Sequence, residues 1–506
     1  MFKKIFSALF FLSIFSFFFY LRLGPIAHKT VPYTYDQGRD FLKAEEIVRY
    51  KNPTFIGPTT GIMGVYHGPW WYYFLAVPYA ISHGNPTGFL VFIFLSSLLQ
   101  ALLFALFIKK EFGLWFSLFF LSLVTLSPYF ITLSFFAISS ILTLPFILLL
   151  LWSTYNFLRK QSLFFIFLIF FSLGFIFEAE VPFGIFIIPS YLLTIFLAKK
   201  VTYFFYRKRG VLYALLGIFL PTIPRALFEV KHNFSQTRVL LNFLVHPLFH
   251  NPQPFANIIA TRATLFTDFY LSLFPDKNIF LALVILTLTI AGFIVGIKQS
   301  QNSDLKKIAY LKFVAILFSL LFITSLFYKD NFWSNYYEGL PYFYTVFIVL
   351  GFYFLNKKFK KFSAVFLPIV ITVLLLFALF DLYKSKNDIN KVVGMRAQIA
   401  AVNSIYAHEK SDFCVRVYTP PVIPYTYNYL FDYYSQTKNL RSPTASFASN
   451  KCWYIMEREQ VGEQFQARVV RWRKENIPAG SELIEKKKVN DDISIELWEM
   501  TQPKAP

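Results

Sequence analysis

Charged residues are scarce in this chain, and their scarcity decides its class. Only 15% of the 506 residues are Asp, Glu, Lys or Arg, against the roughly 25% that is usual in soluble proteins. Hydrophobic residues make up 56% of the chain, and the mean hydropathy is +0.50. This composition excludes a soluble protein and indicates a polytopic membrane protein.

Cysteine is almost absent as well. The only two cysteines, Cys414 and Cys452, both lie in the polar C-terminal part, and the sequence has no His/Cys cluster with metal-ligand spacing. The sequence therefore predicts no metal site. A location outside the cytoplasm would permit a disulfide between the two cysteines, and buried free thiols in a sheet are the alternative.

Acidic residues are fewer than basic ones, 28 against 49, which gives a formal net charge of +21. Such an excess in a soluble protein would suggest nucleic acid as a partner, but no separate basic domain or known binding motif is present. Most of the basic residues lie in short loops between apolar segments, where the orientation of a membrane protein explains them. We therefore expect no nucleic-acid partner.

Apolar segments predict about eleven membrane-spanning helices. The first follows Lys3-Lys4 and has no small-residue cleavage site, so we interpret it as an uncleaved span rather than a signal peptide. The predicted spans are 3–22, 87–108, 113–132, 136–158, 162–178, 182–198, 210–228, 278–297, 308–328, 339–356 and 361–383.

A twelfth apolar run, 69–83, decides the predicted topology. It has about fifteen residues, and a crossing needs about twenty. If it lies along the outer surface, Lys3-Lys4, Lys109-Lys110 and all later basic loops fall on the cytoplasmic side, as the positive-inside rule requires. The N-terminus is then cytoplasmic, and four regions lie outside the cell membrane: 24–86, 229–277, 329–338 and the C-terminal tail.

The tail differs in composition from the rest. It is polar, with strand-like stretches at 413–418, 452–456 and 493–498 that alternate with helix-like segments at 391–408 and 463–475. This alternation predicts a small α/β domain. We thus expect a membrane domain over 1–383, with its first outer loop at 24–86, and an extracytoplasmic α/β domain over 384–506.

Ionisable side chains gather in the first outer loop. Asp36 and Asp40 are four residues apart and would share one face of a helix. Arg39 and Lys43 lie close enough to lower the pKa of the carboxylates and to bind a phosphate. One interpretation is a general base that takes a proton from a hydroxyl. The other is a solvated amphipathic helix with Asp36 as its N-cap.

The second motif is His67-Gly68-Pro69, followed by the aromatic run 70–73. Gly-Pro breaks the backbone and starts a helix, and Trp and Tyr favour the headgroup level of a membrane. His67 would bind a phosphate or a sugar, or else make a structural hydrogen bond in its loop.

The order of these features resembles the GT-C glycosyltransferases, and most closely family 39, the protein mannosyltransferase and aminoarabinose transferase group. That family usually has Asp-Glu where this chain has Asp36-Gln37, and His-Pro-Pro where it has His67-Gly68-Pro69. Many members carry an Asp after the Ser-Pro that ends the third span, whereas no acid follows Ser127-Pro128-Tyr129 here. The resemblance covers roughly residues 1–360.

The resemblance implies transfer of a sugar from a polyprenyl-phosphate donor to an acceptor hydroxyl, with inversion. Asp36 is the expected base and Asp40 the second catalytic carboxylate. The leaving phosphate needs cations to stabilise its developing charge. The candidates for this role are Arg39, Lys43, His67, Arg225, Lys231, His232 and Arg238.

Further acids lie at the predicted outer edge. Glu178 and Glu180 either orient the sugar or hold a metal, or they mark the end of a span. Tyr337 and Glu338 either line the acceptor path or anchor a helix at the interface. Family 39 favours no required metal or other cofactor, although other GT-C enzymes use a divalent ion. Besides the donor and membrane lipids, the partner is an acceptor that is a lipid, a glycan or a protein.

Two other functions fit a membrane protein of this size. A transporter or flippase of a lipid-linked substrate usually shows inverted repeats or paired broken helices near the midplane. Here the ionisable residues gather at one membrane face, which favours the enzyme. About eleven spans are too many for a mere anchor of the tail.

The topology can be tested with reporter tags inserted at 84–86 and at Lys109-Lys110. We expect the first tag to report the extracytoplasmic side and the second the cytoplasmic side, because only 87–108 crosses between them. Two tags on the same side would contradict the surface placement of 69–83.

Overall fold

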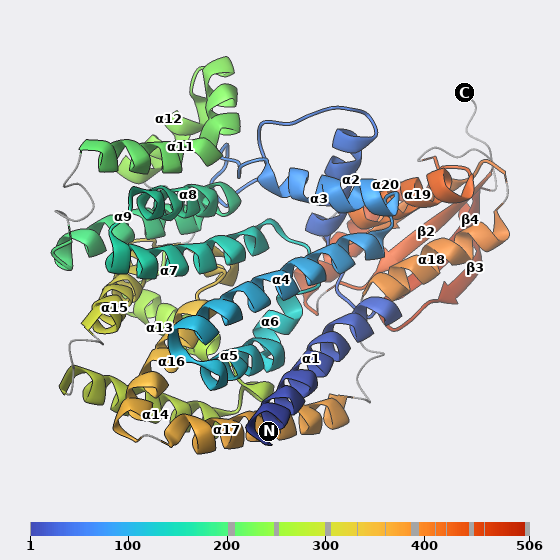
Figure 1. The fold of residues 1–506 in the computed structure, drawn as a ribbon. Coiled ribbons are helices and arrows are strands. Elements are labelled where there is room, and N and C mark those ends of the chain that lie inside the picture. Colours follow the sequence, from blue (N-terminus) through green and yellow to red (C-terminus); the bar gives the residue numbers. More distant parts are fainter. Residues whose placement is uncertain are drawn as a thin grey trace.

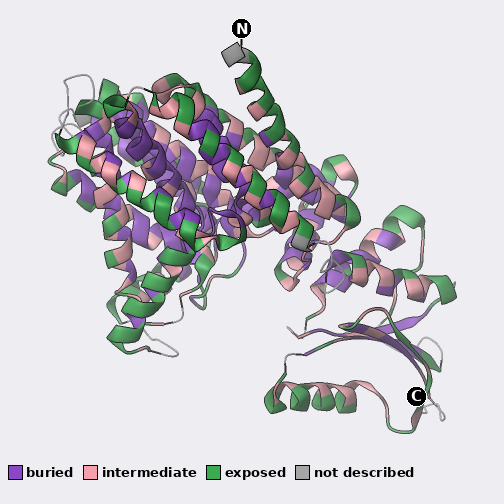
Figure 2. Ribbon diagram, turned by 90° about the horizontal axis from the view of Figure 1, so that it is seen from below, coloured by how far each residue is buried: buried purple, intermediate pink, exposed green. Residues whose placement is uncertain are grey.

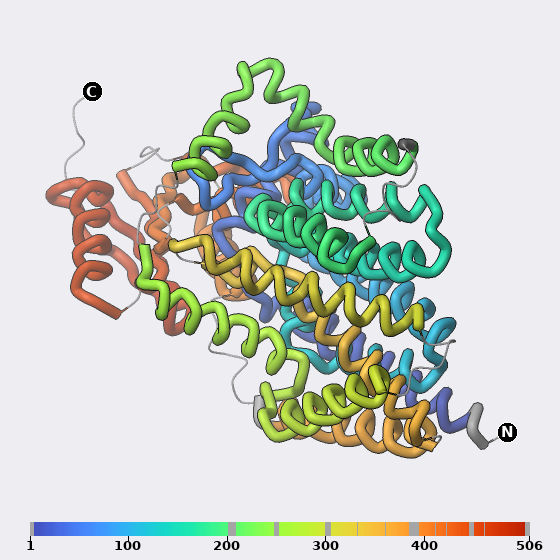
Figure 3. The backbone as a smooth tube through the Cα atoms, turned by 90° about the vertical axis from the view of Figure 1, so that its left-hand side faces the viewer, coloured from blue at the N-terminus to red at the C-terminus, as the bar shows by residue number. Residues whose placement is uncertain are grey.

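Long apolar helices build most of the structure, and a small sheet domain lies at one side of them (Figure 1). This computed structural model describes residues 2–500, except 201–207, 247–251, 299–304, 331, 360, 386–393, 410, 421–422, 445–449 and 460. Figure 3 shows the same helices from the side, with the sheet domain next to the bundle.

The apolar helices follow the predicted spans closely. They are α1 (Phe2–His28), α4 (Pro86–Phe112), α5 (Leu114–Leu126), α6 (Pro128–Leu133), α7 (Thr143–Lys160), α8 (Leu163–Ala179), α9 (Val181–Leu197), α11 (Lys208–Lys231), α14 (Ile279–Lys298), α15 (Leu305–Ser325), α16 (Pro341–Lys358) and α17 (Phe362–Ser385). Among the described residues, seven helical segments are long and apolar enough to cross a membrane, in α1, α4, α7, α11, α14, α15 and α17. The protein is therefore a multi-pass membrane protein, and the number of eleven spans stays a prediction.

The connections between these helices carry shorter elements. They are α2 (Tyr35–Val48), α3 (Trp70–Ser82), α12 (Ser235–Val245), α13 (Phe255–Leu271) and the 3₁₀ turns η1 (Ser139–Leu142), η2 (Pro275–Lys277) and η3 (Ser334–Tyr337). The expected surface segment 69–83 is a separate helix, α3, of 13 residues. Its aromatic residues Trp71 and Tyr72 are buried against the rest of the protein.

The span predicted over 113–132 is not one helix, which corrects the sequence interpretation. It breaks at Ser127, between α5 and α6. Pro128 has no N–H to donate to the carbonyl of Val124, four residues earlier. The buried guanidinium of Arg22 replaces that donor, at 2.9 Å from the Val124 oxygen and 3.0 Å from the Thr125 oxygen. The first span was predicted to end at Arg22, but α1 continues to His28, and Arg22 lies buried inside the helix, where it satisfies the break between α5 and α6.

The C-terminal part forms the expected α/β domain. Its elements are α18 (Met395–His408), β1 (Cys414–Tyr418), α19 (Tyr425–Lys438), β2 (Lys451–Glu457), α20 (Glu463–Asn476), β3 (Ser481–Lys488) and β4 (Ile493–Met500). The strands lie in the order β1-β2-β4-β3, with β1 parallel to β2 and the other pairs antiparallel. The edge strand β3 was not predicted, because its sequence is mostly charged and exposed, as is common at sheet edges.

Each face of the sheet packs against a different partner. Tyr418, Tyr454 and the disulfide Cys414–Cys452 form a small core with Trp472 of α20. The structure therefore contains the disulfide, not the free thiols. The other face packs on α18 and α19, whose buried side chains join the same apolar core as the membrane helices. Figure 2 shows α20 as the helix farthest from the bundle, with the sheet between it and the other two helices.

Arg22 is the residue on which the helix break depends most. Replacing it in Arg22→Leu leaves the carbonyls of Val124 and Thr125 without donors in an apolar setting. We expect a loss of roughly 3 kcal/mol in the free energy of unfolding, measured in detergent micelles. Tyr20→Leu, at an exposed position of the same helix, should leave stability unchanged. Equal stability of both variants would contradict the role of Arg22.

Candidate active site

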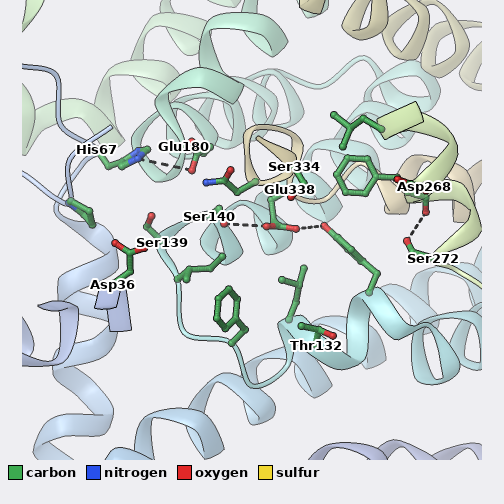
Figure 4. A pocket seen from close by; sticks show the side chains of 18 of the residues that line it. Asp36, His67, Thr132, Ser139, Ser140, Glu180, Asp268, Ser272, Ser334 and Glu338 are labelled. Carbon is green, nitrogen blue, oxygen red and sulfur yellow. Dashed lines mark hydrogen bonds and ion pairs between the residues drawn. The ribbon is translucent and has the colours of Figure 1, made fainter. Parts of the chain in front are cut away.

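A polar cavity of about 700 Å³ lies where α2, the loop after it, the α5–α7 connection, α13 and η3 meet. The polar residues that line it are Asp36, Arg39, Asp40, Thr59, His67, Tyr129, Thr132, Ser139, Ser140, Glu180, Asp268, Ser272, Lys277, Ser334, Asn335 and Glu338. Figure 4 shows ten of these, with Asp36 and His67 on one side and Asp268 on the other. The cavity thus brings together residues from five separate parts of the sequence.

The guanidinium of Arg39 holds two carboxylates in this cavity. One nitrogen lies 2.8 Å from Asp36 Oδ1, and two others lie 2.8 Å from Asp40 Oδ1. The side chain of Asp36 is 54% exposed, whereas that of Asp40 is only 1% exposed. The two carboxylates therefore have different environments, and only Asp36 is open to a bound molecule.

Asp40 is tied into the protein. Its second oxygen accepts a hydrogen bond of 2.7 Å from the indole N–H of Trp71 in α3. Burial raises the pKa of Asp40 to about 6, against the lowering effects of Arg39 and Trp71. This carboxylate fixes Arg39 and links α2 to α3, which suits a positioning group better than a base.

The start of α2 gives Gln37 a structural role. The N-cap of the helix is Thr34, so the alternative interpretation of Asp36 as the N-cap is wrong. The Gln37 side chain accepts a hydrogen bond of 2.8 Å from the Thr34 backbone N–H, as the third residue of a capping box does. Gln37 is therefore a structural residue that fixes the first turn, and Asp36 lies in that turn.

His67 is fixed as a neutral imidazole. Its Nδ1 accepts a hydrogen bond of 3.2 Å from the Val181 N–H, which leaves the proton on Nε2, 4.0 Å from Glu180 Oε2. Burial and, to a smaller extent, the nearby cations Arg225 and Arg39 together lower the pKa of His67 to about 3. As a neutral donor, His67 offers a hydrogen bond to a ligand rather than a positive charge.

The residue after His67 must be glycine for a steric reason. A Cβ at this position would lie 2.0 Å from Glu178 Oε2. The carboxylate of Glu178 is buried there in an ion pair with Arg225, 2.7 Å from its Nε. Arg225 also donates to Gln236, which accepts from the Tyr66 backbone N–H. Glu178 and Arg225 thus hold the histidine loop from behind and do not line the cavity.

Two further acids line the cavity, Glu180 beside His67 and Glu338 beside Tyr129 and Ser140. Glu338 accepts hydrogen bonds from Tyr129, at 2.6 Å, and from Ser140, at 3.1 Å. Burial raises its pKa to about 7, although both hydrogen bonds lower it. Burial, and then the charge of Glu338, raises the pKa of Glu180 well above its usual value. Both carboxyls therefore have a raised pKa and line the cavity, and their role in binding a sugar or an acceptor stays a prediction.

The structure leaves several predicted residues outside the cavity. Lys43 pairs with Glu46, at 2.6 Å, and Tyr337 is buried with its hydroxyl on the Leu321 carbonyl. The other three, Lys231, His232 and Arg238, are exposed and are not among the lining residues. Their predicted role in binding a phosphate stays a prediction.

Two charged residues that line the cavity were not predicted. Asp268 lies near the end of α13, and Lys277 lies in η2 just after it. Asp268 stands in an otherwise mostly apolar helix, and an acid in such a place is a signal of function that the sequence did contain. Lys277 follows Asp276, and nothing in that local pattern distinguishes it from a solvated loop residue.

Comparisons with known proteins support the fold. No protein-family model and no curated protein matches this chain. Among solved structures, ArnT from Cupriavidus metallidurans in the apo state matches with a TM-score of 0.61 and 10% identity, over 98% of each chain. ArnT from the same organism bound to undecaprenyl phosphate matches with a TM-score of 0.59 and 10% identity, over 97% of this chain and 98% of that one.

These observations define a multi-pass membrane protein with a GT-C fold, as expected from the resemblance. Its particular architecture is similar to that of ArnT over nearly the whole chain, including the C-terminal sheet domain.

The neutral state of His67 can be tested through stability. Because its pKa in the folded protein, about 3, lies below the ordinary 6.5, the unfolded chain takes up a proton as the pH falls from 6.5 while the folded protein does not. Between pH 7.5 and 5, wild type should lose about 2 kcal/mol of unfolding free energy relative to His67→Gln. Chemical unfolding in detergent at both pH values measures this difference, and identical pH responses would contradict it.

Proposed function

We propose that the protein is a membrane glycosyltransferase that moves a sugar from a polyprenyl-phosphate donor to an acceptor hydroxyl. The observation that carries the proposal is the half-exposed carboxylate of Asp36, held by Arg39 at the wall of the polar cavity. The shared fold with ArnT, one structure of which contains undecaprenyl phosphate, supports a lipid-linked donor.

Asp36 and Asp40 have separate roles in this proposal. Asp36 accepts the proton of the acceptor hydroxyl as its oxygen attacks the anomeric carbon. The bond between that carbon and the phosphate oxygen breaks on the opposite face, and its electron pair leaves with the lipid phosphate. One displacement of this kind inverts the anomeric centre. Asp40 touches neither reactant and keeps Arg39 oriented.

The leaving phosphate needs positive charge, and Lys277 is our first candidate. Arg39 already bonds two carboxylates, and His67 is neutral, so neither offers an uncompensated charge. Lys277 lines the cavity and forms no ion pair with another described residue. A free ammonium stabilises the charge that develops on a departing phosphate. We therefore add Lys277 to the predicted phosphate ligands.

An apolar groove of about 270 Å³ lies next to the cavity and suits the prenyl chain of the donor. Its walls come from the loop before His67, α9, α12 and the end of α15, and include Ile62, Phe186, Phe243, Phe327 and Tyr336. Tyr336 follows directly on Asn335, which lines the polar cavity. A lipid with its phosphate in the cavity would thus find apolar surface nearby.

The proposal places the cavity and the domain 384–506 on the extracytoplasmic side of the cell membrane, with the N-terminus in the cytoplasm. The basic clusters at the opposite ends of the helices support this orientation. At Lys109-Lys110 and Arg159-Lys160, for example, α4 and α7 end in basic last turns. The acceptor is then a hydroxyl of a lipid, a glycan or a protein outside the cytoplasm.

The decisive experiment supplies the purified protein with a panel of polyprenyl-phosphate sugars and identifies the products by mass spectrometry. Asp36→Asn should lower transfer by about 10²–10⁴-fold, as expected for loss of a general base, with unchanged folding. Asp412→Asn replaces an exposed Asp of the C-terminal domain and should transfer normally. Full activity of Asp36→Asn would exclude Asp36 as the base. Movement of a lipid-linked sugar across vesicles without transfer would favour a flippase instead.

A further inference from the structure

The helix that carries Asp36 has two different faces. The residues that line the cavity are Asp36, Arg39 and Asp40. Positions 35, 38, 41 and 45 recur every three or four residues, which places them together on another face of α2. This second face meets α19 of the C-terminal domain, and four separate contacts join the two helices.

The closest of these contacts is at Gly38. A Cβ at this position would lie 2.4 Å from the backbone nitrogen of Thr426 and 2.5 Å from the carbonyl carbon of Tyr425. These are main-chain atoms in the first turn of α19, so they cannot rotate away as a flexible side chain would. The backbones of α2 and α19 therefore touch, and only glycine permits this approach.

Side chains extend the contact on both sides of Gly38. Tyr35 packs on Tyr425 with 4.9 Å between ring centroids. Phe41 lies between Tyr429 of α19, at 5.4 Å, and Phe89 of α4, at 3.9 Å. Phe41 is fully buried by this arrangement.

Polar contacts join α19 to α2 and to the loop between α3 and α4. The Tyr429 hydroxyl donates to the Gly84 carbonyl at 2.5 Å, and Gln436 donates to the carboxylate of Glu45 at the end of α2. A second connection lies nearby, where the backbone N–H groups of Met395 and Arg396 donate to the carbonyls of Val31 and Lys29, each at 3.0 Å. The segment leading into α2 is thus held by the C-terminal domain too.

From these contacts we infer that α19 is a positioning element of the active site. It presses on α2 at Gly38 and so holds Asp36 and Arg39 at the wall of the cavity, which gives the C-terminal domain a role in catalysis without contact to substrate. The expected effect of α19 on sugar transfer rests on the proposed function. Its expected effect on the position of α2 does not.

Gly38→Ala tests the inference with a single methyl group. In an isolated helix this change is stabilising, whereas here the methyl must displace α19 or α2. We expect kcat to fall at least about tenfold, with the KM for the donor changed less than about threefold, because a small misplacement of a reacting group is costly. Amide hydrogen exchange in 35–48 should become faster.

Gly24→Ala is the matched control. Gly24 also lies inside a helix, α1, but apart from its chain neighbours and the backbone of its own helix, no atom lies within 4 Å of the place where its Cβ would be. This variant should keep the kcat, the KM and the exchange rates of wild type. If Gly38→Ala behaves in the same way in both measurements, the positioning role is overturned.

A cross-link separates a fixed support from a moving lid. Glu45→Cys combined with Gln436→Cys joins α2 to α19 under oxidising conditions, and the linked protein should keep its activity because the contact stays closed. Loss of activity on oxidation that reduction restores, in the double variant but not in wild type, would show that α19 must move away and would overturn the inference. If Gly38→Ala does not fold, the cross-linking experiment still tests the positioning role of α19.

The two proposals fail in different ways. One outcome is faster amide exchange in Gly38→Ala together with a wild type that transfers no sugar from any donor. It would support the contact between α2 and α19 and refute the proposed function. A wild type that transfers sugar, together with a Gly38→Ala variant that exchanges and transfers normally, would refute the positioning role alone.

Discussion

The arrangement of the site depends on one guanidinium shared by two carboxylates. Arg39 holds Asp36 at the cavity wall and compensates the charge of Asp40, which is buried and bonded to Trp71. A buried carboxylate without such partners would be strongly unfavourable. Removing Arg39 would therefore leave two acids without their cation and loosen the contact between α2 and α3. The proposed chemistry needs only the exposed carboxylate of Asp36. The supporting contacts extend further, from Arg39 and Asp40 in α2 to Trp71 in α3.

A second buried ion pair supports the loop that carries His67 in the same way. Glu178 and Arg225 lie behind the loop that carries His67, and Gly68 leaves room for the Glu178 carboxylate. Asp40 with Arg39 and Glu178 with Arg225 both support groups that face the cavity. Charged residues near a bilayer are costly, and in this protein several of them are used to hold loops and helix ends in place rather than to bind a ligand.

The sequence predicted one half of the cavity well and the other half poorly. Asp36, Arg39, Asp40 and His67 were found because they form short motifs in one loop. Glu180 and Glu338 were found as acids at the ends of apolar segments. Asp268 and Lys277 were missed, since no motif surrounds them. Arg225 was predicted to bind the phosphate, and in the structure it pairs with Glu178 and does not line the cavity. The element α19 was missed as well, although it contacts the predicted base helix most closely.

The sequence by itself determined the places of the apolar helices, the separate helix α3, three of the four strands and the class of fold. These depend on hydrophobic runs, alternation and helix-breaking residues, which are properties of neighbours in the chain. Only the tertiary structure decided which charges face the cavity, because their partners are distant in sequence. Tyr129 and Glu338, for instance, are 209 residues apart. The break at Pro128 could be expected locally, but its compensation by Arg22, and the approach of Thr426 to Gly38, follow from packing alone.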